Sequence, residues 1–356
     1  MNGYTGETRM SEQQRDRATG HRGRTREGFP PHRTSFQGKR ASCLVLLFAM
    51  MFVVSCKGGG DAGPAPAASA GKKAKFTIGM SQCNLGEPWR VQMNADIAAA
   101  AKEHPDYEIV WRDAQNDTRK QRAHVEELAQ AKVDVLIISP KEAQPLTDPV
   151  AKVFDAGIPV IVLDRAVLGD KYTTFIGADN KKIGKAAGEW AKQVLGGKGK
   201  VVELKGLMTS TPGQDRNAGF REALQGTEIE VAFEADMKWL EPDARKEMDS
   251  ALSRLPKIDL VYAHNDPGAH GAFLAAKAAG REKEMKFVGI DALPHEGVAY
   301  VEQGLLDATF QYPTGGREAI DVAGKILRGE KPPKTMTLGS RMFTKDNVKQ
   351  GGKAID

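Results

Sequence analysis

The segment VDVLIISP at residues 133–140 is an almost unbroken run of branched apolar residues. Two further segments have the same form: IPVIVLDR at residues 158–165 and IDLVYAHND at residues 258–266. Runs of this length, bounded by helical stretches, are typical of strands buried on both faces of a parallel sheet. Ligands of open α/β sheets bind just beyond the carboxyl ends of the strands. The polar pairs at those ends, Asp164-Arg165 and Asn265-Asp266, therefore predict a site rich in hydrogen-bonding groups.

Predicted strands and amphipathic helices alternate from Lys75 onward, in two successive series. The first series comprises strands at 76–81, 107–111, 133–139 and 158–164, with helices at 91–102, 118–132 and 147–156. The second comprises helices at 180–195, 213–225, 242–255, 268–279 and 294–303, with strands at 200–206, 228–235, 258–266, 286–291 and 307–310. Two such series, in about 280 residues, are too long for one ordinary domain. We therefore predict an α/β protein with two similar doubly wound parallel-sheet lobes.

The N-terminal region differs from the rest of the chain. Residues 1–40 show no apolar periodicity and cannot form a core. The basic pair Lys39-Arg40 precedes an apolar run at residues 43–54, CLVLLFAMMFVV, which is typical of a secretory signal and short for a permanent membrane span. The residues that follow, VVSC at 53–56, resemble the bacterial lipobox, in which the cysteine becomes the lipid-modified first residue.

We therefore expect residues 1–55 to form an N-terminal extension and a lipoprotein signal peptide, with Cys56 as the lipidation site. Residues 56–74 are rich in Gly, Ala and Pro, a composition typical of a flexible tether. An uncleaved signal anchor with an incidental cysteine is the alternative. The start is also open, since Met10 is a second candidate for it.

The formal net charge of +5 comes from the N-terminal region. Residues 1–55 hold nine Lys/Arg and four Asp/Glu, and the remaining residues hold 42 of each. A nucleic-acid-binding domain needs a basic surface, so the balanced charge argues against that class. Only Cys83 lies in the globular region, and no disulfide can form within it.

Seven segments carry a resemblance to a known family: MSQ…EPWR at 80–90, VLDR at 162–165, GADN at 177–180, VVELKG at 201–206, DRNAGF at 215–220, VYAHND at 261–266 and VGIDA at 288–292. From Lys75 to its end the chain resembles the ribose/galactose class of periplasmic sugar-binding proteins, the type I solute-binding proteins of ABC transporters. Within that class it is most similar to the galactofuranose-binding proteins. The Trp-Arg pair and YAHND are fairly specific, whereas the other segments mark only the wider class.

The resemblance implies two lobes joined by a three-segment hinge, with crossings near residues 179–180, 311–314 and 339–341. The N-terminal lobe would hold residues 75–178 plus 313–339, and the C-terminal lobe residues 179–312 plus 340–356. It also implies a monomer in the periplasm or cell envelope, which binds a monosaccharide and delivers it to an ABC transporter permease. No cofactor, metal or nucleic acid is implied. A sugar-sensing receptor that signals to a membrane kinase or chemoreceptor remains an alternative, because it would have the same site.

Candidate ligand contacts in the first lobe lie after three predicted strands. The indole of Trp89 could pack flat on a sugar ring, and Glu87 and Arg90 would add an acceptor and a donor from the same loop. Asp164 follows five apolar residues and needs a partner there. Its carboxylate could accept from sugar hydroxyls while Arg165 donates, in charge-assisted hydrogen bonds. A core tryptophan, a solvated loop pair and a structural ion pair are the respective alternatives.

Candidates in the second lobe rest more on the resemblance. It implies that Arg216 contacts the sugar, and Asn265 and Asp291 offer polar groups at strand ends. His264 is expected to be a hydrogen-bonded strand-end residue. The family places an aromatic residue across the sugar, and Met237 or Trp239 could fill that place, with Trp239 favoured. Gln311 would be a polar contact beside a crossing, in a register uncertain by one residue.

Other classes lack their motifs. GGKGK at 196–200 lacks phosphate-loop spacing, GAHGAF and HEGVAY lack the spacing of a zinc site, and no serine has a nucleophile-elbow context. We therefore predict that the protein is not an enzyme. A sugar-responsive transcriptional regulator would need DNA-binding helices where the signal and tether lie.

Overall fold

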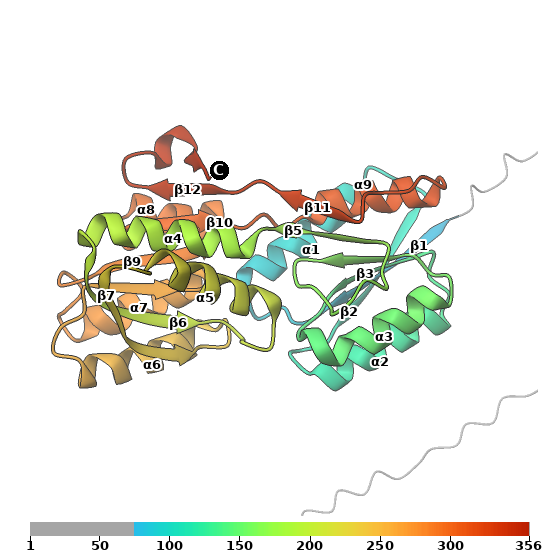
Figure 1. Ribbon diagram of the computed structural model, residues 1–356. Helices are drawn as coiled ribbons and strands as arrows, with labels where there is room; N and C mark the ends of the chain where they lie inside the picture. The colour runs from blue at the N-terminus through green and yellow to red at the C-terminus, as the bar shows by residue number, and fades with distance from the viewer. Residues whose placement is uncertain (1–74, 356) are drawn as a thin grey trace, which may run out of the picture. The chain divides into compact units, whose positions relative to one another are not determined.

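The first lobe is built on a six-stranded sheet in which all neighbouring strands are parallel (Figure 1). A computed structural model describes residues 75–355, and the predictions about the signal peptide, Cys56 and the tether fall outside this range. The sheet's spatial order is β11 (Thr335–Leu338), β5 (Thr174–Ala178), β4 (Val160–Leu163), β3 (Val135–Ser139), β1 (Phe76–Gln82) and β2 (Tyr107–Asp113).

The second lobe is built on a seven-stranded sheet. Its spatial order is β13 (Lys353–Ala354), β12 (Arg341–Thr344), β10 (Ala308–Gln311), β9 (Lys286–Asp291), β8 (Leu260–Ala263), β6 (Lys198–Lys205) and β7 (Glu228–Asp236). The strands from β10 to β7 are parallel, whereas β12 and β13 add an antiparallel edge. The predicted fold class, an α/β protein with two doubly wound lobes, is confirmed.

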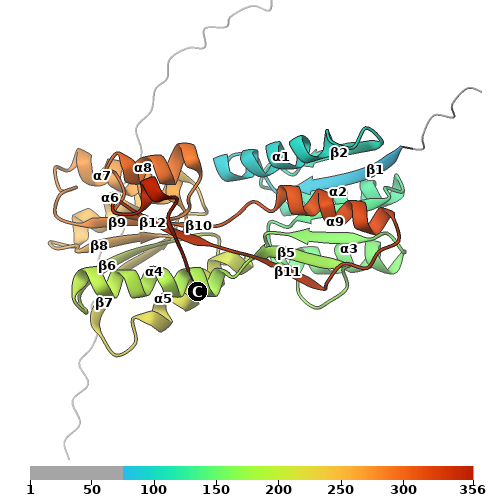
Figure 2. The same ribbon diagram turned by 90° about the horizontal axis from the view of Figure 1, so that it is seen from above.

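The chain passes between the two sheets three times (Figure 2). It passes after β5, where α4 begins at Asn180, again between β10 and α9, and finally between β11 and β12. Asp179 starts α4 by accepting a hydrogen bond from the Lys182 N–H at 2.9 Å. The exact residues that bound each lobe stay a prediction.

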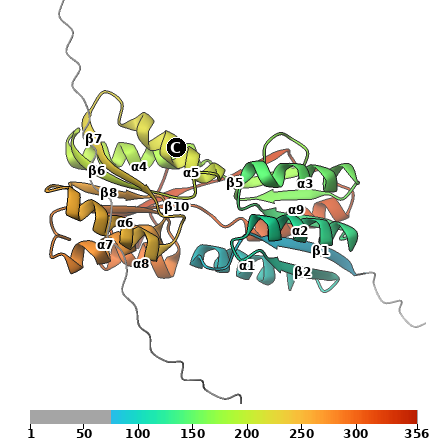
Figure 3. The same cartoon turned by 90° about the horizontal axis from the view of Figure 1, so that it is seen from below.

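Helices cover both faces of each sheet (Figure 3). In the first lobe, α1 (Pro88–Ala101) and α9 (Gly316–Leu327) lie on one face, and α2 (Thr118–Gln130) and α3 (Ala143–Asp155) on the other. In the second lobe, α4 (Asn180–Leu195) and α5 (Thr211–Ala223) lie opposite α6 (Glu241–Arg254) and α7 (Asp266–Ala278).

The surroundings of strand β3 explain why polar and apolar residues do not alternate in its sequence. Val135 and Ile137 pack into the core beneath α1 and α9, whereas Leu136 and Ile138 pack against α2 and α3. Successive side chains of a strand point to opposite faces, so a strand covered on both sides must be apolar throughout. The continuous apolar runs therefore identify the central strands of both sheets.

Some predicted elements differ from the structure. The helix predicted at 294–303 is present, but its first part is a π-helical turn, η1 (Pro294–Val298), which leads directly into a short α8 (Ala299–Glu302). Helix α3 begins at Ala143, four residues before the predicted start, because Pro145 and Pro149 are tolerated within it. The apolar pattern also missed β5, β12, β13 and the short 3₁₀ turn η2 (Val348–Gln350). Among residues 75–355, no helix is long and apolar enough to cross a membrane.

Candidate ligand-binding site

A cavity lies between residues of the two lobes. The lining residues are Glu87, Trp89, Arg90, Asp164, Arg165, Pro212, Arg216, Trp239, Asn265, Asp291 and Tyr312. Nine of the ten residues proposed from the sequence are among them. None of the nine is more than 7% exposed.

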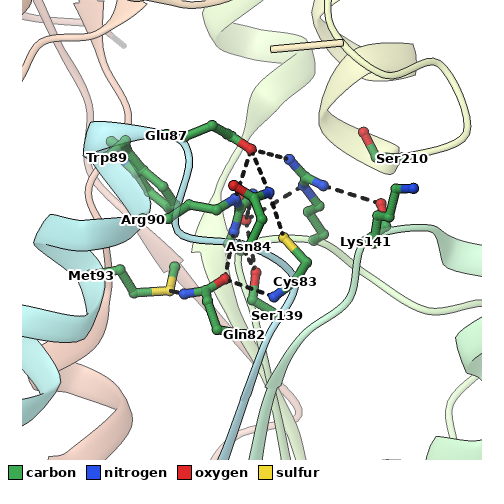
Figure 4. Close-up of polar contacts among 12 residues, drawn as sticks. Gln82, Cys83, Asn84, Glu87, Trp89, Arg90, Met93, Ser139, Lys141 and Ser210 are labelled. Carbon is green, nitrogen blue, oxygen red and sulfur yellow. Dashed lines mark hydrogen bonds and ion pairs between the residues drawn. The ribbon is translucent and has the colours of Figure 1, made fainter. Parts of the chain in front are cut away.

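Arg90 is the most heavily bonded residue of the first-lobe wall (Figure 4). Its Nε donates to Glu87 Oε1 at 3.2 Å, and its Nη1 donates to Gln82 Oε1 and Ser139 Oγ. Its Nη2 donates to Asp164 Oδ2 at 3.0 Å. Because four of its five N–H donors already have protein acceptors, Arg90 orients the two carboxylates more than it offers hydrogen bonds to a ligand.

Asp164 and Arg165 keep groups available for a ligand. Asp164 accepts both of its hydrogen bonds on Oδ2, from Arg90 and from Ser139 Oγ at 3.1 Å. Its Oδ1 accepts no hydrogen bond from residues 75–355. Arg165 donates from Nη1 to the Lys141 carbonyl at 3.1 Å, but within the described part of the chain its buried Nε has no hydrogen-bond partner. The structure thus supplies a free acceptor beside a free donor.

The second-lobe wall carries an opposite pair, Arg216 and Asp291. Arg216 extends from α5, donates from Nε to Asn180 Oδ1 at 2.8 Å, and donates from Nη1 to the His264 carbonyl. Its Nη1 lies 3.6 Å from Asp291 Oδ1, beyond direct hydrogen-bond distance. Burial raises the pKa of Asp291 well above its usual value, although Arg216 partly offsets this. Such a desolvated carboxyl group favours hydrogen-bond donors from a ligand.

Asn265 and Trp239 are linked through the loop that precedes α6. Asn265 caps α7 by accepting from the Gly268 N–H at 3.0 Å, and it donates to the Trp239 carbonyl at 3.0 Å. One amide hydrogen and one lone pair of Asn265 remain for a ligand. The buried Trp239 indole N–H has no hydrogen-bond partner among the described residues.

The two candidates for the second-lobe aromatic position lie in different surroundings. Trp239 lines the cavity, whereas Met237 is fully buried in the core of the second lobe. Trp239 has a left-handed backbone with φ of 71°, which turns its side chain back over Gly206. A Cβ atom at Gly206 would lie 2.2 Å from the indole ring, so only glycine fits beneath it. The guanidinium groups of Arg165 and Arg216 each lie 5.4 Å from the ring centre.

Gln311 is the proposed contact that the structure places elsewhere. Gln311 lines an adjoining open depression, whereas its neighbour Tyr312 lines both the depression and the cavity. Gln311 ends β10, and successive side chains along a strand point in opposite directions, which accounts for the one-residue difference. Pro212 and Tyr312 were missed by the sequence analysis, and the aromatic character of Tyr312 beside a predicted crossing was the signal that could have found it.

Tyr312 joins elements that meet at the hinge. Its carbonyl accepts from Trp89 Nε1 at 2.8 Å, and its hydroxyl donates to the Asp164 carbonyl at 3.0 Å. The Arg216 guanidinium lies 4.9 Å from its ring centre. Tyr312 therefore contacts both the first-lobe loops and a second-lobe arginine.

His264 is a structural residue, as predicted. Its Nε2 lies 3.0 Å from Glu203 Oε1, and both side chains are fully buried. Burial lowers the pKa of His264, and the Glu203 carboxylate acts in the opposite direction. Within residues 75–355, no group of three or more His, Cys, Asp or Glu residues is placed to hold a metal ion.

The family of the chain follows from comparison with known proteins. The family described as periplasmic binding protein domain matches residues 78–331. The chain belongs to this family. Its members are extracytoplasmic binding proteins, so this chain is a solute-binding protein, and the prediction against an enzyme is confirmed.

Three relatives illustrate the range of named ligands. The ribose import binding protein of Salmonella typhimurium is 32% identical over 74% of this chain and 88% of its own length. The galactofuranose-binding protein of Escherichia coli is 29% identical over 78% of this chain and 90% of its own length. A solved structure, the fructose-binding periplasmic domain of a hybrid two-component system, is 44% identical over 78% of this chain and 93% of its own, with a TM-score of 0.75. These identities support the sugar-binding class without favouring its galactofuranose members.

Proposed function

We propose that this protein captures one monosaccharide between its two lobes and delivers it to the permease of an ABC transporter. The observation that carries this proposal is the buried cavity, whose wall holds two donors, Arg165 Nε and Trp239 Nε1, that have no hydrogen-bond partner among residues 75–355. A buried donor without a partner costs about 1–3 kcal/mol. A ligand hydroxyl between the lobes would remove that cost for both groups, one from each lobe.

The charges of the cavity favour an uncharged sugar. Three guanidinium groups face three carboxyl groups in the lining, so neither sign is in clear excess. Paired charges of this kind suit hydroxyl groups, which both donate and accept. The relatives named for ribose, galactofuranose and fructose bind sugars that can adopt five-membered rings. We propose a furanose as the ligand, with fructose and galactofuranose as the first candidates.

We assign the contacts by the groups that remain free. Trp89 and Trp239 would pack on the apolar faces of the ring. The free oxygen of Asp164 and the carboxyl group of Asp291 would accept from ligand hydroxyls. Arg165, Arg216 and Asn265 would donate, while Glu87 and Arg90 hold the first-lobe wall in place. The ligand thus contacts both lobes, as a closed state stabilised by ligand requires.

Calorimetric titration tests this proposal. The purified protein is titrated with D-fructose, D-ribose, D-galactose, D-glucose, L-arabinose and a galactofuranoside, with gluconate and fructose 6-phosphate as charged controls. We expect saturable one-to-one binding of one or two uncharged sugars and no binding of the charged controls. Failure of every sugar to bind, or preference for a charged control, would refute a neutral monosaccharide ligand.

A second function, sugar sensing, is favoured by one observation. The relative with 44% identity is the periplasmic domain of a hybrid two-component system. The ligand site would be the same, so binding experiments do not distinguish the two functions. Deleting the gene distinguishes the two functions. If the protein is a transport component, the deletion abolishes uptake of radiolabelled sugar. If it is a sensor, the deletion abolishes sugar-induced transcription, while constitutively expressed permeases still import the sugar.

We further propose that Cys56 carries a lipid that holds the protein at a membrane surface, with residues 56–74 as the tether. The support is the apolar run followed by Val-Val-Ser-Cys. Cells producing the wild type or Cys56→Ser are labelled with radioactive palmitate and fractionated. The wild type should be labelled and sediment with membranes, and the variant should be neither. Equal labelling of both would exclude Cys56 as the site.

A further inference from the structure

A buried carboxylate lies directly behind the second-lobe wall. Asp266, the first residue of α7, is 0% exposed and does not line the cavity. Its Oδ2 accepts a hydrogen bond from the Ala292 backbone N–H at 2.7 Å, and its Oδ1 accepts one from Thr309 Oγ1 at 2.6 Å. Asp266 thus connects α7 to the ends of β9 and β10.

Two glycines, Gly289 and Gly297, leave room for this carboxylate. A Cβ atom at Gly289 would lie 2.3 Å from Asp266 Oδ1, and one at Gly297 would lie 1.9 Å from Oδ2. Both distances are far below a van der Waals contact, so two elements use glycine where they meet Asp266. Burial raises the pKa of Asp266 to about 7, which agrees with a dry surrounding.

The backbone that Asp266 binds is strained. Asp291 has φ of 129° and Ala292 has φ of 52°, values that residues with a Cβ atom rarely adopt. This conformation turns the Asp291 carboxyl group into the cavity at the end of β9. A strained conformation persists only where surrounding contacts hold it, and the hydrogen bond to the Ala292 N–H is such a contact.

We propose that Asp266 is a positioning residue, which holds the backbone of residues 291–292 so that Asp291 faces the ligand. This inference rests on the proposed function, because it assigns Asp266 to the binding of that ligand. Asp266 acts through Asp291 and does not touch the ligand itself.

Amide hydrogen exchange tests the backbone part without any ligand. In the wild type, the Ala292 amide should be protected by its bond to Asp266. Asp266→Ala should accelerate its exchange at least tenfold, whereas Asp266→Asn retains an acceptor and should keep exchange within about threefold of the wild type. Unchanged protection in Asp266→Ala would overturn the proposal. Should Asp266→Ala fail to fold, Thr309→Val removes one partner of Asp266 and should give a smaller acceleration at Ala292.

Calorimetry with D-fructose and D-ribose tests the link to the ligand. Asp266→Ala should weaken Kd at least tenfold, and Asp266→Asn should restore it. Adding Asp266→Ala to Asp291→Asn should cost little further affinity, because both changes remove the same contact. Additive losses would overturn the proposed coupling.

Asp117→Ala, which removes a carboxylate from the start of α2, controls for general destabilisation and should leave Kd unchanged. Failure of the wild type to bind any sugar would refute the proposed function, while the exchange result would still decide whether Asp266 positions this backbone.

Discussion

At the scale of single residues, the strongest prediction concerns the effect of Asp164 on sugar binding. Asp164 has a left-handed backbone with φ of 71°, which asparagine tolerates better than alanine does. Asp164→Asn should weaken sugar binding at least tenfold, because charge-assisted hydrogen bonds contribute about 1.5–3 kcal/mol. Asp164→Ala should weaken it beyond detection. Calorimetry gives the affinities, and thermal denaturation should show that both variants fold, since Glu87 still pairs with Arg90 at 3.2 Å. Wild-type affinity in either variant would remove Asp164 from the site.

The raised pKa of Asp266 predicts how the stability of the folded protein depends on pH. Burial raises this pKa to about 7 in the folded protein, whereas an unfolded aspartate has a pKa of about 3.9. The hydrogen bonds from Thr309 and Ala292 lower the pKa, Glu296 raises it, and Arg216 lowers it. The folded state therefore binds the proton more tightly. The stabilisation from Asp266 is complete below about pH 4 and is lost as the pH rises through about 7.

Asp266→Asn resembles the protonated form at every pH and isolates this contribution. Between pH 5 and 8, the wild type should lose stability relative to the variant, by up to about 1.4 kcal/mol per pH unit for one proton. Calorimetric melting at several pH values measures this difference. Burial also raises the pKa of Asp291 and of Glu296. The comparison subtracts Glu296, but the charge of Asp266 also raises the pKa of Asp291, so the difference measures Asp266 together with its effect on Asp291. Parallel pH profiles would exclude Asp266 as a titrating group.

At the scale of secondary structure elements, the sequence predicted what depends on burial pattern and missed what depends on neighbours. The all-apolar β3 and β8 were predictable because helices cover both of their faces. β13 was not, since it has only two residues and pairs only with β12. Nine of the residues that line the cavity were predictable from strand ends and family motifs. Tyr312 was not, because its place in the lining depends on contacts to Trp89 and Asp164, which are far away in sequence.

The start of helix α5 makes a prediction about closure. The hydroxyl of Thr211 accepts a hydrogen bond from the Ala166 backbone N–H at 3.0 Å, across the two lobes, and Thr211 does not line the cavity. Thr211→Val keeps the shape but removes the acceptor, so the closed state should lose about 1 kcal/mol and Kd should rise about fivefold. Thr211→Ser restores the hydroxyl and should bind as the wild type does. Calorimetry compares the three proteins, and equal affinity of the valine variant would mean that this contact does not stabilise closure.

At the scale of the whole molecule, the structure describes a closed state. Residues that line the cavity are buried, although a ligand of sugar size must pass between them to enter. The Ala143 N–H also donates to the Thr209 carbonyl at 3.2 Å, which joins the start of α3 to the loop before α5. A ligand can therefore enter only if these lobe contacts open. Hinge closure of this kind is the known behaviour of periplasmic binding proteins.

A disulfide between these two positions would test the requirement for opening. Residues that share a direct backbone hydrogen bond lie close to the Cα separation of roughly 4.4–6.8 Å that a disulfide spans. Ala143→Cys with Thr209→Cys, in a Cys56→Ser background, leaves only the fully buried Cys83 as a further thiol in the described residues. Oxidation without sugar should abolish binding of radiolabelled sugar, and oxidation with sugar should trap the sugar through gel filtration. Reduction should reverse both effects, because it restores the hinge motion. Normal binding by the oxidised, sugar-free protein would show that the ligand enters without separation of the lobes, and the site between them would then need another explanation.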